Sequence, residues 1–168
     1  MSGPVSARKA LAELTRLSFT HVLSIPDSES SALHDAIASH PDIELIVPAR
    51  EGESVAIAAG LWTGGAKPLL LIQNTGVMEA GDSIRGCGLG PRIPLRMIIG
   101  WRGYKGVERG ARPIDSAFTY TEPLLAALGI PAPRLTGNGD LRLIEEMDRT
   151  AERTSMPAAV LVTHGFAE

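Results

Sequence analysis

The 168-residue sequence contains one cysteine, few aromatic residues and no long apolar run. The single cysteine, Cys87, excludes an internal disulfide and a cysteine-rich zinc site. Aromatic residues make up only 4% of the chain, which argues against binding of single-stranded nucleic acid by base stacking. The sequence has no run of about 18 apolar residues, the length needed to cross a membrane. Residues 1–4 lack the features of a signal peptide. We therefore expect a cytoplasmic protein that binds neither membranes nor nucleic acid.

The rest of the composition is that of a globular protein. Hydrophobic residues make up 44% of the chain and charged residues 21%, with a formal net charge of -3. These proportions are ordinary for a folded domain and unlike those of a disordered chain. The length suits one domain with a core of its own, so we expect residues 1–168 to form a single domain.

Helical and strand-like segments alternate along the chain with short connections. We expect strands at residues 22–25, 43–47, 69–72, 95–99, 133–136 and 158–162. We expect helices at residues 7–17, 28–37, 51–62, 116–128 and 141–153, a loop entering a helix at 75–87, and a loop at 100–115. Continuous apolar strands joined by helices are typical of a buried parallel sheet. The pattern therefore predicts a three-layer α/β/α fold with a mostly parallel sheet of about six strands.

In such folds, ligands bind beyond the carboxyl ends of the strands, so the loops after strands are the places to search. One of these loops leads into Glu51 and Glu53, which are followed by small apolar residues at 55–59. Two interpretations are open for this pair of acids. They can complement the dipole of the helix that begins there, or one of them can serve a functional site that another surface approaches closely.

Four short motifs follow strands in the chain: Pro26-Asp27-Ser28, Arg50-Glu51-Gly52, Gln73-Asn74-Thr75-Gly76 and Trp101-Arg102-Gly103. In this order they resemble the pyrimidine-binding (PYR) domain of thiamine-diphosphate enzymes, most closely the sulfopyruvate and phosphonopyruvate decarboxylases. The corresponding family patterns are Pro-Asp-Ser, Asn-Glu-Gly, Gln-Asn-Ser-Gly and Trp-Arg-Gly. The resemblance covers essentially the whole chain and implies the PYR-domain version of the predicted fold.

The resemblance also implies an activity and a set of site residues. The activity is decarboxylation of an anionic pyruvate analogue, 3-sulfopyruvate or 3-phosphonopyruvate, to the aldehyde and CO2. Glu51 is the implied catalytic residue. A carboxylic acid that is hydrogen-bonded to N1′ of the cofactor's aminopyrimidine promotes the change of tautomer of that ring. It does so most effectively in a partly dry pocket, where desolvation raises the pKa of the acid. The implied cofactor-binding residues are Pro26, Glu51, Asn74, Thr75 and Gly76. The implied substrate-binding residues are Asp27, Ser28, Gln73 and Arg102.

One element of a complete thiamine site is missing from the sequence. The diphosphate is held in this family through Mg²⁺ by a Gly-Asp-Gly motif and a downstream asparagine, and the only asparagines here are Asn74 and Asn138. We therefore expect no metal site in this chain. The resemblance implies a separate β subunit with a diphosphate-binding (PP) domain that holds the Mg²⁺, in a hetero-oligomer that shares thiamine diphosphate between subunits.

Two positions depart from the family pattern. Arg50 stands where asparagine is usual, and Val77-Met78-Glu79 stands where a Gly-Asn pair is common. These departures keep two alternatives open. One is a non-catalytic, PYR-like scaffold or regulatory subunit, and the other is a different thiamine-dependent reaction, carboligation or acyl transfer.

Basic residues are concentrated in one part of the chain. The segment 85–112 carries a charge of +6, which leaves -9 for the remainder. Its basic residues are Arg85, Arg92, Arg96, Arg102, Lys105, Arg109 and Arg112. At the ends of strands such a segment suits a sulfonate, phosphonate or carboxylate, which arginine binds bidentately. Solvation or contact with an acidic partner subunit explains the same charges equally well.

Overall fold

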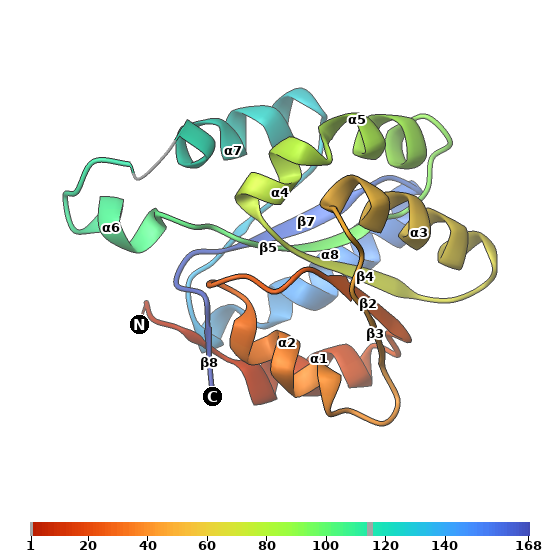
Figure 1. Cartoon of the computed structure of the whole chain (residues 1–168), viewed down its shortest axis with the longest axis horizontal. Helices are drawn as coiled ribbons and strands as arrows, with labels where there is room; N and C mark the ends of the chain where they lie inside the picture. The colour runs from red at the N-terminus through yellow and green to blue at the C-terminus, as the bar shows by residue number, and fades with distance from the viewer. Residues whose placement is uncertain (1, 114–115) are drawn as a thin grey trace.

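A six-stranded parallel sheet forms the centre of the protein in a computed structural model that describes residues 2–113 and 116–168 (Figure 1). Its strands are β2 (His21–Ser24), β3 (Glu44–Ile46), β4 (Pro68–Gln73), β5 (Arg96–Gly100), β6 (Arg134–Leu135) and β7 (Ala158–Val162). They lie in the order β3-β2-β4-β5-β7-β6, and every neighbouring pair is parallel. The predicted three-layer α/β/α fold is thus confirmed.

Helices cover both faces of this sheet. One face is covered by α1 (Ala7–Arg16), α2 (Ser31–Ala38) and α8 (Arg142–Thr154). The other is covered by α3 (Glu51–Thr63), α4 (Asn74–Glu79), α5 (Gly81–Ser83), the π-helix η1 (Ile84–Leu89) and α7 (Ser116–Ala127). No helix in the described part of the chain is long and apolar enough to span a membrane.

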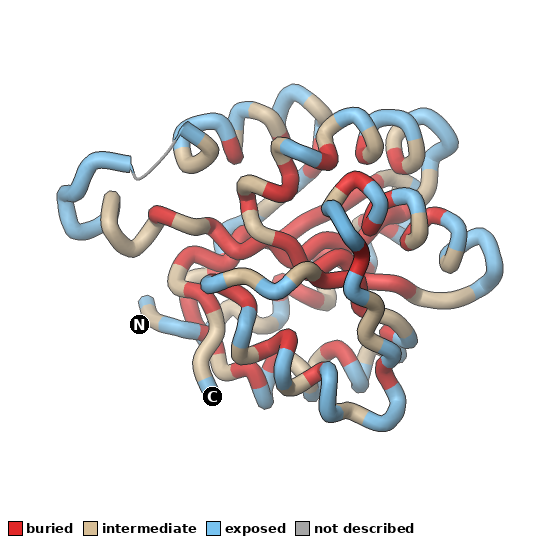
Figure 2. The backbone as a smooth tube through the Cα atoms, viewed as in Figure 1, coloured by how far each residue is buried: buried red, intermediate tan, exposed pale blue. Residues whose placement is uncertain are grey.

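The inner strands β2, β4, β5 and β7 are mostly buried (Figure 2). Their side chains alternate between two separate apolar layers. Along β4, Leu69 and Leu71 pack into the layer beneath α1, α2 and α8, whereas Leu70 and Ile72 pack into the layer beneath α3 and α7. Successive side chains on a strand point to opposite faces, so a strand covered on both faces must be apolar throughout. This requirement explains the continuous apolar runs that predicted the strands.

The strand order reverses between β2 and β4, which defines where a ligand can bind. From β2 the chain passes through α2 to β3 on one side, and from β3 it returns through α3 to β4 on the other side. The crevice beyond the carboxyl ends of strands at such a reversal is the usual ligand site of open parallel sheets. Here it is flanked by the loop after β2 and by the turn from β4 into α4.

Two segments differ from the sequence prediction. Residues 100–115, predicted as a loop, contain α6 (Tyr104–Glu108), a five-residue helix with Gly103 and Gly110 in left-handed conformation on either side. A helix this short shows no apolar period, so the sequence could not reveal it; residues 114 and 115 lie outside the described residues. Residues 75–87, predicted to begin as a loop, are helical from Asn74 onward.

The two ends of the described chain meet in a small second sheet. The strand β1 (Val5–Ser6) pairs in parallel with β8 (Phe166–Ala167). The N- and C-terminal segments therefore lie side by side at the edge of the molecule (Figure 1). The sequence prediction missed this pair because two-residue strands carry no periodic signal. The short 3-10 helix η2 (Asn138–Asp140) supports it, since the Asn138 side chain accepts a hydrogen bond from the Ser6 amide at 2.9 Å.

Candidate active site

Glu51 is the first residue of α3 and lies half-buried against α4. A Cβ atom added to Gly76 would lie only 2.6 Å from Cγ and from Oε1 of Glu51, so the carboxylate rests directly on the glycine backbone. Within the described residues, the Glu51 carboxylate makes no hydrogen bond or ion pair. An acidic group held in place by packing, with its oxygens unused, is available to a ligand.

Glu53 serves the chain itself, although it belongs to the same helical turn. Its Oε2 accepts a hydrogen bond at 2.7 Å from the backbone N–H of Ala49, just before the helix. The side chain is exposed. Glu53 therefore fits the structural interpretation, an acid at the start of a helix, whereas Glu51 has no such backbone partner in the described chain.

Glu79, at the end of α4, binds the start of α3. Its Oε1 accepts a hydrogen bond at 2.6 Å from Nε of Arg50, and its Oε2 accepts one at 2.6 Å from the backbone N–H of Gly52. The Arg50 guanidinium also forms an ion pair with Glu79. The two departures from the family pattern are thus partners in one interaction beside Glu51.

The loop after β2 is fixed by Asp27. Its carboxylate accepts hydrogen bonds from the backbone N–H groups of Glu29 (2.6 Å) and Ser30 (2.9 Å) and from the Ser30 hydroxyl (2.5 Å). Asp27 therefore turns the chain into α2, and its oxygens are engaged within the chain. Pro26 and Ser28, on either side, are exposed at the edge of the sheet.

The turn from β4 into α4 holds three of the predicted site residues. The Thr75 hydroxyl donates to Oε1 of Gln73 at 2.9 Å, and both side chains are partly exposed. Asn74 is fully buried, and its amide donates to the Thr121 hydroxyl of α7 at 3.1 Å. The Asn74 side chain has no exposed surface and ties α4 to α7, and its cofactor-binding role stays a prediction.

Trp101 and Arg102 follow β5, next to this turn, since Gln73 pairs with Gly100 in the sheet. Arg102 is half-buried at the sheet edge. Trp101 is 3% exposed and stacks on Phe118 of α7, with 5.2 Å between ring centroids. The Trp-Arg-Gly motif therefore contributes a core residue together with a polar one at the carboxyl end of the strand.

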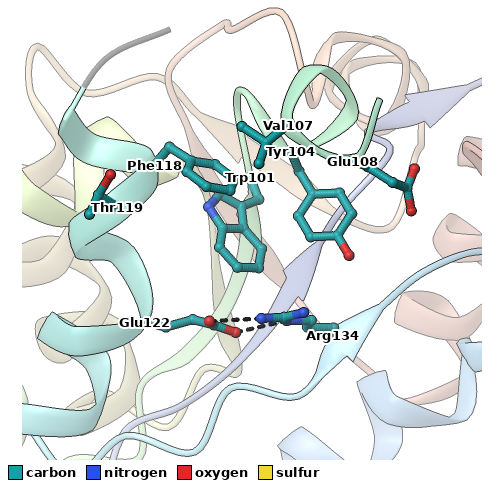
Figure 3. Close-up of a pocket in the computed structure, with 8 residues that line it drawn as sticks. All are labelled: Trp101, Tyr104, Val107, Glu108, Phe118, Thr119, Glu122 and Arg134. Atoms are coloured by element: carbon teal, nitrogen blue, oxygen red, sulfur yellow. Dashed lines mark hydrogen bonds and ion pairs between the residues drawn. The ribbon is translucent and has the colours of Figure 1, made fainter. Parts of the chain in front are cut away.

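A pocket of about 420 Å³ lies beside Trp101, between α6, α7 and β6 (Figure 3). The guanidinium of Arg134 lies 5.0 Å from the Trp101 ring centroid and forms two 2.8 Å hydrogen bonds to Glu122. Donating these hydrogen bonds to Glu122 raises the pKa of Arg134 above its ordinary value. Among the described residues that line this pocket, none is a predicted site residue, and the one cation, Arg134, is paired with Glu122. The pocket is therefore a separate feature from the crevice at Glu51.

The basic segment 85–112 does not form one surface. Arg96 is the first residue of β5, at the amino edge of the sheet, where it binds Asp148 and Glu152. Arg85 pairs with Asp82, and Arg92 donates to the carbonyl oxygen of Thr154. Only the part from Arg102 onward follows the carboxyl end of β5, so the predicted anion site can involve that part of the segment alone.

Sequence reasoning missed one buried acid at the carboxyl edge, Glu29. Its side chain packs against Gly100, where an added Cβ would lie 2.8 Å from the Glu29 Cβ, and against Gly165 after β7. Its Oε2 lies 3.4 Å from Nζ of Lys105 in α6. Glu29 thus ties the loop after β2 to the ends of β5 and β7. The glycines after those strands were the available signal, because glycine permits close approach of another segment.

Comparison with known proteins gives similar sequences over most of the chain. It is 32% identical over 102 residues to a phosphonopyruvate decarboxylase of Streptomyces viridochromogenes, and 29% identical over 124 residues to a sulfopyruvate decarboxylase of Methanosarcina acetivorans. It is 27% identical over 144 residues to the alpha subunit of sulfopyruvate decarboxylase from Methanococcus maripaludis. These similarities, at modest identity, support the predicted assignment to the phosphonopyruvate and sulfopyruvate decarboxylases. No protein-family model matches it.

The members of this family are covered to very different extents. The aligned segment is 61% of this chain but only 26% of the Streptomyces decarboxylase, and 73% of this chain but 30% of the Methanosarcina protein. The chain therefore spans between a quarter and a third of these longer relatives. With the Methanococcus alpha subunit, the alignment covers 84% of both chains. Of these three relatives, the one that this chain matches in length is named as a subunit.

Proposed function

We propose that this chain is the PYR-type subunit of a thiamine-diphosphate-dependent decarboxylase and supplies the acid that activates the cofactor. The observation that carries the proposal is the placement of Glu51. Its carboxylate is unpartnered within the described residues and rests on Gly76, beside the crevice where the strand order reverses. Similarity to proteins named as decarboxylases supports a decarboxylase, and the unused carboxylate gives that activity a specific residue.

The residues at this crevice fit part of a thiamine diphosphate site. Glu51 would hold the aminopyrimidine, with the Gly76 backbone beneath it and Pro26 and Thr75 at the neighbouring strand ends. When bound, the cofactor supplies a nucleophilic carbon for the 2-oxo group and an electron sink for the departing carboxylate. The role of Glu51 is to donate a hydrogen bond to a ring nitrogen, which requires the carboxyl to carry a proton at that moment.

The diphosphate and its Mg²⁺ belong, in this proposal, to a partner subunit with a PP domain. The sequence offers no Gly-Asp-Gly motif with a downstream asparagine. The similarity in length to a relative named as an alpha subunit supports a two-chain complex. The substrate is an anionic 2-oxoacid, sulfopyruvate or phosphonopyruvate, for which Ser28, Gln73 and Arg102 are the polar groups at the carboxyl edge. Asp27 shapes this site through the backbone of its loop.

Reconstitution tests the proposal. The chain is mixed with a PP-domain subunit, sought first in the neighbouring genes, and with thiamine diphosphate and Mg²⁺, and CO2 release is measured with sulfopyruvate, phosphonopyruvate and pyruvate. We expect release from an anionic analogue only when both chains are present, with kcat in the ordinary range of about 1–10³ s⁻¹. A complex that binds thiamine diphosphate yet releases CO2 from none of the three acids would contradict decarboxylation and favour carboligation or acyl transfer.

Replacing Gly76 with alanine is expected to lower kcat of this complex by about 10–100-fold while leaving the fold intact. The new methyl group would occupy the position of the Glu51 carboxyl, which can swing away because it is the end of a flexible side chain. Thermal unfolding should stay close to wild type, since alanine favours a helix over glycine by up to about 1 kcal/mol. Gly81→Ala is the matched control, because an added Cβ there meets nothing within 4 Å. Equal kcat in the two variants would refute the contact between Glu51 and Gly76.

The non-catalytic alternative loses its main motivation in this structure. It was suggested by Arg50 and Glu79, two residues that depart from the family pattern. They bind each other and the helix turn that carries Glu51, so their presence is compatible with catalysis. A scaffold role would also be favoured by a Glu51 buried in the core of its own chain, whereas Glu51 is partly exposed at the sheet edge.

A further inference from the structure

We propose that Glu79 is a positioning residue that sets the direction in which the Glu51 carboxyl points. This inference rests on the proposed function of Glu51 and adds a second residue to it. Glu79 contacts both neighbours of Glu51 in the chain, the Arg50 side chain through Oε1 and the Gly52 backbone N–H through Oε2, each at 2.6 Å. A single carboxylate from another helix thereby holds the Gly52 backbone after Glu51 and the Arg50 side chain before it.

The same helix also supports the Glu51 side chain. Gly76 and Glu79 are three residues apart in α4, so they lie on one face of it. The Glu51 carboxyl packs on Gly76, and Glu79 accepts a hydrogen bond from the backbone N–H of Gly52, the residue after Glu51. The position of α4 is itself fixed, because Val77 is fully buried and Asn74 is bonded to α7. The helix α4 therefore contacts both the side-chain carboxyl of Glu51 and the backbone next to it.

Helix α3 needs this contact because it has no cap of its own. The first N–H groups of a helix have no partner within the helix, and the N-cap residue, Arg50, makes no capping hydrogen bond. Glu79 supplies the missing acceptor with a charged hydrogen bond to Gly52, which is stronger than a neutral one. Gly52 leaves room for this contact, because an added Cβ would lie 3.3 Å from Glu79 Oε2 and 3.0 Å from the Ser83 hydroxyl, and these side chains would have to shift slightly.

Arg50 balances the charge of this arrangement. Its guanidinium forms an ion pair with Glu79, so the positioning carboxylate adds no unpaired charge next to Glu51. The Arg50 side chain is 68% exposed and that of Glu79 is 32% exposed. The orientation of Glu51 should therefore depend mainly on the partly buried hydrogen bond between Glu79 and the Gly52 N–H, because exposed ion pairs contribute little to stability.

Three variants of the reconstituted complex test the inference: Glu79→Ala, Glu79→Gln and, as control, Asp82→Ala. We expect Glu79→Ala to lower kcat at least about 10-fold with KM within about 3-fold of wild type, the pattern of a displaced catalytic group. Glutamine keeps an acceptor for the Gly52 N–H, so Glu79→Gln should recover most of this loss. Asp82 forms an exposed pair with Arg85 on the neighbouring helix, and its loss should change nothing.

Amide hydrogen exchange of the chain provides a readout independent of activity. In Glu79→Ala the backbone amides of residues 52–54 should exchange at least about 10-fold faster, because the opening of this helix turn becomes easier. Faster exchange with unchanged kcat would make Glu79 a helix cap only and overturn the inference, and so would wild-type values of both. If the alanine variant does not fold, kcat is compared between Glu79→Gln and Arg50→Gln. A lower kcat in Arg50→Gln alone would assign the effect to the ion-pair charge and not to the hydrogen bond to Gly52, and would overturn the inference.

The two proposals can fail separately. If Glu51→Gln is inactive while Glu79→Ala is fully active, the positioning role is wrong and the proposed function stands. If Glu51→Gln is itself fully active, the proposed function is wrong, and Glu79 has no catalytic group to position.

Discussion

A complex carrying Glu51→Gln is expected to release CO2 about 10²–10⁴-fold more slowly than wild type, the usual contribution of a positioned acid or base. Glutamine preserves the size of the side chain and its packing on Gly76, but its amide cannot exchange a proton with the cofactor. Because the carboxylate makes no hydrogen bond or ion pair within the described residues, the substitution breaks no contact of the fold. The measurement is steady-state CO2 release together with thermal unfolding.

Glu53→Gln is the matched control, since it removes the same charge from the same helical turn. Glu53 serves the Ala49 N–H, and glutamine can still accept that hydrogen bond. If both acids merely complement the helix dipole, each substitution should cost about 0.3–1 kcal/mol of stability and leave kcat alone. Loss of activity in Glu51→Gln only is the result that separates a catalytic acid from a dipole effect. Similar kcat values in the two variants would contradict the assignment of Glu51.

Arg96→Met is expected to destabilise the chain by about 3–5 kcal/mol, the usual cost of breaking a buried ion pair from one side. The Arg96 side chain is 2% exposed and binds Asp148 at 2.6 Å, Glu152 at 2.5 Å and the Pro94 carbonyl oxygen at 2.9 Å. Without it, the one ion pair left to the buried Asp148 within the described residues is that with Lys67, at 2.7 Å. Since proteins are stable by about 5–15 kcal/mol, this is a large fraction of the total.

Urea unfolding of the chain measures this loss, with Arg85→Met as the control. Arg85 is also paired with an aspartate, but its side chain and that of Asp82 are 67% and 87% exposed. Exposed pairs contribute about 0–1 kcal/mol, so Arg85→Met should unfold close to wild type. If both variants unfold at the same urea concentration, the network around Asp148 is not the stabilising feature that its burial indicates. Activity per folded complex should be unchanged in both, because neither arginine lies at the carboxyl edge.

The sheet and the placement of the loops that form the candidate site were predictable because both follow from local patterns. Strands buried on both faces must be apolar, so runs such as 69–72 identify themselves. Parallel strands bring their carboxyl ends to one edge, so polar residues after different strands come together there. Glu51 and Gly76 are 25 positions apart, and the fold class alone places their loops at the same edge.

Contacts between side chains of different elements were not predictable in the same way. Arg50 and Glu79 looked like two unrelated departures, and only the packing of α4 on α3 reveals them as a pair. The burial of Asn74 depends on α7, which lies more than 40 residues away in the sequence. The position of Arg96, by contrast, was predictable. Because it stands at the start of a strand, it lies at the amino edge of the sheet, opposite the candidate site. The sum of charges over residues 85–112 ignored strand direction, which separates Arg96 at the amino edge from Arg102 at the carboxyl edge.

Exchange of the thiazolium C2 proton of bound thiamine diphosphate with deuterium tests the central claim most directly. Complexes containing wild-type chain, Glu51→Gln or Glu53→Gln are mixed with D2O, quenched in acid and analysed by proton NMR. If Glu51 activates the cofactor, exchange in the Glu51→Gln complex should be at least about 100-fold slower than in wild type, and exchange in the Glu53→Gln complex should be unchanged. Equal exchange rates in the wild-type and Glu51→Gln complexes would contradict the role assigned to Glu51.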